Sequence, residues 1–137
     1  MSDEERYGYR DLTYSKWHRP SSGFLGRSIS YIDLDCCEYC KSCYAPLVLL
    51  ELAKDVGQLD KAVMVTHHLA KLSNLPAYLV FYHTNPDIRG GIDQFRIRQI
   101  YPEGSFDCEW VWPPEVYATW LTAFHDEHRC YQRGEYK

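Results

Sequence analysis

Three acidic side chains stand in or beside two segments with the patterns of β-strands. Asp33 and Asp35 belong to an alternating segment, and Glu51 interrupts the apolar run Pro46–Leu52. If the two segments pair as a hairpin, the carboxylates converge at one end of a sheet, where they could hold Mg²⁺ or Mn²⁺ and activate water against a phosphodiester. The alternative is that these acids face solvent at the sheet end, although a buried Glu51 without a partner would be costly.

A cluster of cysteines fills the turn between the same two segments. Cys37, Cys40 and Cys43 form two overlapping C-x-x-C spacings, which is how a turn presents thiolates to zinc. A structural zinc ion needs four ligands, so Cys108, Cys130 or a histidine would have to complete the site. The alternative is that these cysteines are small buried apolar residues.

The elements that must position these residues follow from the hydrophobic pattern. We predict an α+β (α/β) fold in one domain, residues 1–137, with a central mixed β-sheet flanked by helices. A helix between two apolar strands is a natural crossover, so part of the sheet should be parallel. The predicted elements are a loosely helical segment over residues 3–19, strands Ser28–Tyr39, Pro46–Leu52, Ala77–Tyr82 and Gln94–Tyr101, and helices Lys61–Leu72 and Glu115–Arg129.

Composition restricts the classes of function. The net charge is −4, so any contact with nucleic acid must come from a local basic patch. No apolar run approaches the roughly 20 residues that a membrane helix needs, and the N-terminus is polar and acidic, so we expect a cytoplasmic protein that does not enter the membrane. His125 and His128 stand three positions apart on the last predicted helix, where they could bind a metal ion, but we interpret them as part of a solvated, charged helix face. The candidate phosphate-binding residues are Arg19, Arg89, Arg96 and Arg98.

The segment YIDLDCCEYCKSCYAPLVLLELAK, residues 31–54, resembles the core of the PD-(D/E)XK nuclease superfamily, in particular its small phage-type members. In that superfamily a strand Asp is followed by Glu-x-Lys on the next strand, then by a helix and another strand. The resemblance covers roughly residues 12–100. It implies a restriction-endonuclease-like core, in either a nuclease that hydrolyses DNA or a nuclease-derived DNA-binding protein. Asp35 and Glu51 would be ligands of Mg²⁺ or Mn²⁺, with Asp33 as an auxiliary acid.

The chain departs from this pattern where the motif lysine is replaced by Ala53. The resemblance then implies that the catalytic positive charge comes from Lys54, re-aimed by a bulge, or from Lys61 at the start of the next helix. If neither lysine reaches the acids, we expect a non-catalytic interaction protein on the same fold, such as a phage-type regulator with a zinc knuckle. The expected partners are DNA, a host or phage protein, and a second copy of the chain.

Overall fold

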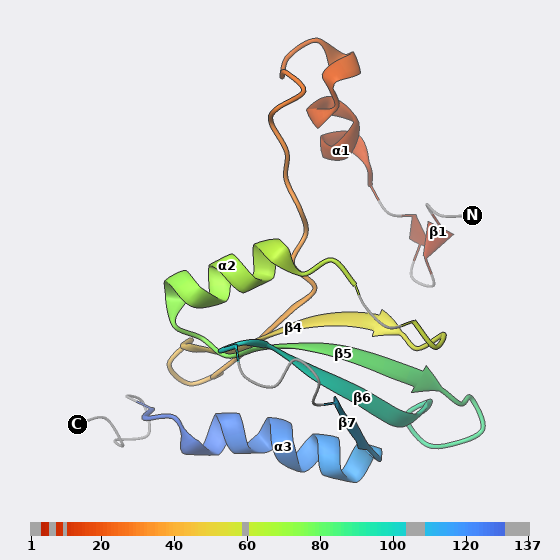
Figure 1. Cartoon of the computed structure of the whole chain (residues 1–137). Coiled ribbons are helices and arrows are strands. Elements are labelled where there is room, and N and C mark those ends of the chain that lie inside the picture. The colour runs from red at the N-terminus through yellow and green to blue at the C-terminus, as the bar shows by residue number, and fades with distance from the viewer. Residues whose placement is uncertain (1–3, 6–7, 10, 59–60, 104–108, 131–137) are drawn as a thin grey trace. The chain divides into compact units, whose positions relative to one another are not determined.

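A computed structural model describes residues 4–5, 8–9, 11–58, 61–103 and 109–130 (Figure 1). Contacts within the chain divide it into two compact units, Met1–Asp33 and Leu34–Lys137, where the sequence predicted one domain. Each unit is described by itself.

The first unit contains short elements only. Strands β1 (Glu4–Glu5) and β2 (Gly8–Tyr9) pair antiparallel, and helix α1 (Thr13–His18) leads into a single 3₁₀ turn, Pro20–Ser22. The predicted strand Ser28–Tyr39 is wrong over residues 28–35, which have no regular secondary structure. Alternation identifies residues that could share a face of a strand, but a strand also needs a neighbouring backbone, and only the last four residues of this segment have one.

The second unit is built on a five-stranded sheet in the order β3-β4-β5-β6-β7. Strands β4 and β5 are parallel and joined through helix α2 (Met64–Ser73), whereas the other neighbours are antiparallel. This confirms the predicted mixed sheet with a helical crossover. The strands are β3 (Cys36–Tyr39), β4 (Pro46–Lys54), β5 (Ala77–Thr84), β6 (Ile92–Tyr101) and β7 (Glu109–Trp112).

Two helices cover opposite faces of this sheet, α2 on one and α3 (Pro114–Glu127) on the other (Figure 1). Strand β4 is buried on both faces because its side chains alternate between the two cores: Leu49 packs on the α2 face and Leu50 on the α3 face. Glu51 shares its sheet face with Leu49 and therefore enters the α2 face. This alternation explains how one acid can interrupt an apolar strand without disturbing its pairing.

Helix α2 begins later than predicted, at Met64 rather than Lys61, so Lys61 lies in the segment that leads from β4 to the helix. Within the residues that the structure describes, no helix has the length and apolar character needed to cross a bilayer.

Candidate functional site

Two carboxylates and one ammonium meet beside β4, and we call Asp35, Glu51 and Lys61 the acid–lysine group. The Lys61 Nζ atom lies 2.6 Å from Asp35 Oδ2 and 3.3 Å from Glu51 Oε1. The sequence predicted that the two acids would converge across the hairpin, and the structure brings both within reach of the same cation. It also places Lys61, one of the two candidate lysines, between them.

Glu51 is held deep in the α2 face, where only 4% of the residue is exposed. Its second carboxylate oxygen, Oε2, accepts a hydrogen bond of 2.6 Å from the Thr66 hydroxyl in the first turn of α2. Both oxygens of this buried carboxylate therefore have a partner, which offsets much of the free energy needed to remove the charge from water. Thr66 was not predicted, because a threonine near a helix start has no distinguishing sequence pattern.

Asp35 and Lys61 share a second contact, the backbone of Leu52. The Leu52 N–H donates to Asp35 Oδ2 over 2.9 Å, and the Leu52 carbonyl accepts from Lys61 Nζ over 2.9 Å. The last β3–β4 pair at this end is Cys36 with Leu50, so the ladder has ended before Leu52. Side chains from Asp35 and Lys61 thus bond to the backbone groups that a longer β3 would have paired.

Electrostatics in this group favour the charged forms of Asp35 and Lys61. Partial burial acts to raise the pKa of Asp35, but hydrogen bonds from Lys61 and the Leu52 N–H outweigh it and hold this pKa below its ordinary value. Burial likewise acts to lower the pKa of Lys61, yet Asp35 and then Glu51 raise it overall. Lys61 is therefore a fixed positive charge near neutral pH.

The other residues predicted for this site lie elsewhere. Lys54 is at the end of β4, three positions after Glu51, so strand alternation directs it to the opposite face of the sheet. Ala53 packs against the α2-face core. Asp33 is the last residue of the first unit, whereas Asp35 and Glu51 belong to the second, so Asp33 is not counted in the acid–lysine group.

A second cluster lies at the other end of β3, and we call Cys40, Cys43, His128 and Cys130 the Cys/His group. One potential ligand atom from each of the four residues lies within 4.8 Å of the other three, so the group could bind a metal ion. Among its contacts, the Cys40 and Cys130 sulfurs lie 3.6 Å apart, and the Cys43 sulfur lies 3.7 Å from His128 Nε2.

The turn that follows β3 directs backbone N–H groups at its own sulfurs. N–H groups of Cys43 and Ser42 donate to the Cys40 sulfur and lower the pKa of that thiol to about 7. The Ala45 N–H acts in the same direction on Cys43, but burial and the neighbouring sulfurs raise the pKa of Cys43 overall. Tyr44 adopts a φ of 64°, which bulky residues rarely do, so this turn is locally strained.

A hydrogen bond to the end of α3 fixes the orientation of the His128 ring. Its Nδ1 lies 2.7 Å from the His125 carbonyl oxygen, and since a carbonyl only accepts, Nδ1 must carry the proton. The lone pair is then on Nε2, the atom that faces Cys43. His128 was interpreted as a solvated residue, and this is corrected by its half-buried position in the cluster.

The prediction for the cysteines was correct in part. Cys40 and Cys43 are together as expected, and Cys130 was one of the residues proposed to complete the site. Cys37 does not belong to the group, because it stands in β3 opposite Leu49 and its exposed thiol contacts the Glu38 carbonyl. Cys108 lies outside the described residues. The spacing His128-x-Cys130 was the overlooked sequence pattern.

The predicted arginines fall into different environments. Arg96 is 12% exposed and is bound to Asp55 at 3.0 Å and to Glu109 at 2.9 Å, with its guanidinium over the Phe81 ring. This internal ion-pair network, rather than a phosphate, accounts for its position on the sheet. Arg98 lies 3.8 Å from the same Glu109, whereas Arg89 is exposed between β5 and β6.

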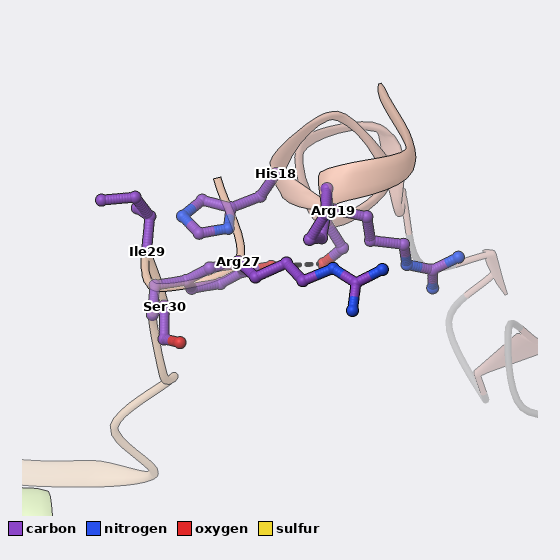
Figure 2. A pocket seen from close by; sticks show the side chains of 8 residues that line it. His18, Arg19, Arg27, Ile29 and Ser30 are labelled. Atoms are coloured by element: carbon purple, nitrogen blue, oxygen red, sulfur yellow. Dashed lines mark hydrogen bonds between the residues drawn. The ribbon is translucent and has the colours of Figure 1, made fainter. Parts of the chain in front are cut away.

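In the first unit, Arg19 lines an open pocket of about 420 Å³ (Figure 2). The side chains of Arg19 and Arg27 extend in the same direction there, and the His18 imidazole lies on the other side, toward Ile29 (Figure 2). The hydroxyls of Ser15 and Tyr31 lie 2.5 Å apart in this pocket. Its cationic and hydroxyl groups are of the kinds that bind phosphate.

Exposed aromatic rings accompany this pocket. Trp17 stacks on Phe24 with ring centroids 5.5 Å apart, and Tyr14 stacks on Trp17 at 5.9 Å. Residues 13–31 also contain three basic residues and no acidic one, against a net charge of −4 for the whole chain. Stacked rings beside cationic side chains are typical of surfaces that bind single-stranded nucleic acid.

Comparison with known proteins adds no relative: no protein-family model, no curated protein and no solved structure matches the chain.

Proposed function

We propose that the chain is a metal-dependent nuclease of the PD-(D/E)XK type that hydrolyses DNA phosphodiester bonds at the acid–lysine group. The observation that carries this proposal is the position of Lys61 Nζ, in contact with the carboxylates of both Asp35 and Glu51. The superfamily motif requires an acid on one strand, an acid on the next strand and a nearby lysine. Here the first acid, Asp35, stands immediately before β3 rather than within it, and the second, Glu51, stands in β4. Here Lys61 takes the place of the missing motif lysine at Ala53.

Mg²⁺ and Mn²⁺ prefer oxygen ligands, and in this proposal the carboxylates of Asp35 and Glu51 would hold the ion. When bound, such an ion supplies charge neutralisation at the phosphate and an activated water. Hydrogen bonds within the protein hold both carboxylates in place. Thr66 fixes the Glu51 carboxylate at 2.6 Å, and the Leu52 N–H fixes Asp35 at 2.9 Å.

Lys61 has the charge that this chemistry needs. Negative charge grows on the phosphate in the transition state, and a positioned ammonium stabilises it in a partly dry site. Burial acts to lower the pKa of Lys61, but Asp35 and Glu51 raise it overall, so the ammonium is charged near neutral pH. Lys61 would then orient the attacking water and stabilise the phosphate.

DNA binding would come from the first unit. Its pocket at Arg19 and Arg27 offers cations for phosphates, and the stacked rings of Tyr14, Trp17 and Phe24 offer faces for bases. This pairing of features favours a substrate with single-stranded or branched character, since only unpaired bases can stack on a protein ring.

A non-catalytic interaction protein on the same fold is the second candidate. The specific observation in its favour is that Lys61 already neutralises both acids without a metal ion, as a structural ion pair would. In that case the acid–lysine group would serve only to end the β3–β4 ladder.

Cleavage assays separate the two candidates. The full chain is incubated with single-stranded, duplex and branched DNA in Mg²⁺ or Mn²⁺, alongside Glu51→Gln and the exposed control Asp87→Asn. We expect cleavage by wild type and control, with a loss of at least about 100-fold in Glu51→Gln, the scale for one electrostatic group in a site. A wild type no faster than Glu51→Gln on every substrate, with both proteins folded by circular dichroism, would leave only the non-catalytic candidate.

A further inference from the structure

We propose that the Cys/His group is a closed structural zinc site that fastens the end of β3 to the end of α3. The inference does not depend on the proposed nuclease activity. It rests on four side chains from two distant parts of the chain, Cys40 and Cys43 in the turn after β3, and His128 and Cys130 just after α3.

Two of the distances between ligand atoms match the edges of a tetrahedral site, and all of them are within 4.8 Å. Zinc bonds of about 2.3 Å to sulfur and 2.0–2.1 Å to nitrogen imply edges of about 3.8 Å between two sulfurs and about 3.6 Å between sulfur and nitrogen. The observed values are 3.6 Å for the Cys40 and Cys130 sulfurs and 3.7 Å for the Cys43 sulfur and His128 Nε2. A disulfide between Cys40 and Cys130 would instead need about 2.05 Å.

The donor types select the metal. Thiolate and imidazole ligands suit zinc, whereas Mg²⁺ and Ca²⁺ take oxygen ligands. Four protein ligands leave no coordination position open for water or substrate, which is the property of structural rather than catalytic zinc. The hydrogen bond from His128 Nδ1 to the His125 carbonyl is the outer contact that fixes a metal-binding imidazole.

The surroundings show what the ion would fasten. Cys40 and Cys130 are buried with Leu47 in a small core, and Phe124 of α3 packs against both this core and the α3-face core of the sheet. Strand β3 is an edge strand of four residues with one neighbour, β4. Fastening its end to the end of α3 would hold it against the sheet, together with the 2.9 Å contact between His125 and Glu38.

Metal analysis of the full-length chain tests this directly. Protein purified without chelator should contain about one zinc per chain. Cys130→Ser and His128→Ala should lose most of it, whereas Cys37→Ser, in the adjacent exposed cysteine, should keep it. Because Cys130→Ser could fail to fold, wild type is also stripped and reloaded with Co²⁺, which should give the absorption of tetrahedral thiolate coordination.

Two further measurements define failure. In zinc-loaded wild type, Cys40, Cys43 and Cys130 should resist a thiol reagent until a chelator is added, and amide exchange in β3 should then accelerate while β5 stays protected. Negligible zinc after purification and reloading, with all thiols reacting promptly, would overturn the proposal. A Cys40–Cys130 disulfide by mass spectrometry would overturn it as well. Both outcomes leave the proposed nuclease activity untouched, since none of these measurements involves DNA.

Discussion

The two polar clusters lie near opposite ends of the same short strand, β3, and differ in what neutralises them. In the acid–lysine group the chain provides its own cation, because Lys61 lies against both carboxylates. The Cys/His group consists of potential metal ligands, three sulfurs and one imidazole nitrogen, and includes no lysine or arginine. The first cluster can therefore fold without metal, whereas the second should need metal to complete its fold. Under the two proposals above, metal removal should stop DNA cleavage at the acid–lysine group and loosen the structure around the Cys/His group.

The largest effect is expected from Lys61→Met. The rate of DNA cleavage should fall by about 100- to 1000-fold, because the positioned charge that stabilises the phosphate is lost. Lys54→Met is the matched control, since Lys54 leaves β4 on the opposite face and its change should alter the rate little. Single-turnover cleavage of the preferred substrate gives both rates. If Lys54→Met were the inactive variant, the position assigned to Lys61 in catalysis would be wrong.

Zinc removal should have the next largest effect, on stability. A ligand at 100 times its Kd stabilises a protein by about 2.7 kcal/mol. In a domain of this size the loss corresponds to a fall in Tm of about 10 °C. Thermal unfolding of wild type is followed with free zinc buffered high and then low, using Cys37→Ser as the matched control. Equal Tm values in the two buffers would mean that this cluster, like the acid–lysine group, is complete without metal.

A smaller effect is expected when the pH is lowered and Asp35 of the acid–lysine group becomes protonated. The free energy of unfolding should fall by about 1 kcal/mol, which is the scale for a partly exposed charge pair. The pKa of Asp35 is lowered on folding, so its contribution is present above its ordinary value of 3.8 and lost as the pH falls through the lower folded pKa. Lys61 is the opposite case: its contribution is present below 10.5 and lost as the pH rises through the raised pKa.

Urea unfolding of wild type and Asp35→Asn checks this dependence. The difference in unfolding free energy should be constant from pH 5 to pH 9 and shrink below pH 4. Taking the difference between two proteins that both retain the Cys/His group removes the effect of acid on zinc. A difference that stayed constant down to pH 2 would show that Lys61 and Asp35 do not stabilise one another.

The smallest effect concerns the first unit, which contains neither cluster. Arg27→Ala should weaken binding of single-stranded DNA only a few-fold and reduce the slope of log affinity against log salt by about 0.7, the value for one phosphate contact. Lys71→Ala, which removes an exposed charge from α2, is the control. Fluorescence anisotropy over a range of salt gives the slopes. Identical slopes for both variants would place phosphate recognition outside the Arg27 pocket.

Local patterns in the sequence were sufficient for the part of the fold in which neighbours along the chain are neighbours in the sheet. The run Pro46–Leu52 is apolar at successive positions because β4 is buried on both faces, and Glu51 stood out for that reason. The convergence of Asp35 and Glu51 followed from a hairpin of known order. The same reasoning failed for residues 28–35, which alternate like a strand but have no neighbouring strand.

Contacts between distant residues were not predictable in this way. Lys61 reaches Asp35 because the segment between β4 and α2 returns to the sheet edge, and no periodicity encodes that path. His128 joins Cys43 across 85 positions only because α3 packs along the sheet. Arg96 was expected to bind phosphate. The strand pattern shows on which face of the sheet its side chain lies, but it does not show that Asp55 and Glu109 lie close enough to form ion pairs with it.

The two hydrogen bonds to Leu52 have a consequence for aggregation. Beyond the end of β3, the backbone of β4 is an open sheet edge, and an open edge invites another strand, including one from a second molecule. Asp35 occupies the Leu52 N–H and Lys61 occupies its carbonyl, so a foreign strand meets two charged side chains instead of free backbone groups. Selection against self-association would then preserve Asp35 and Lys61 independently of any catalytic role.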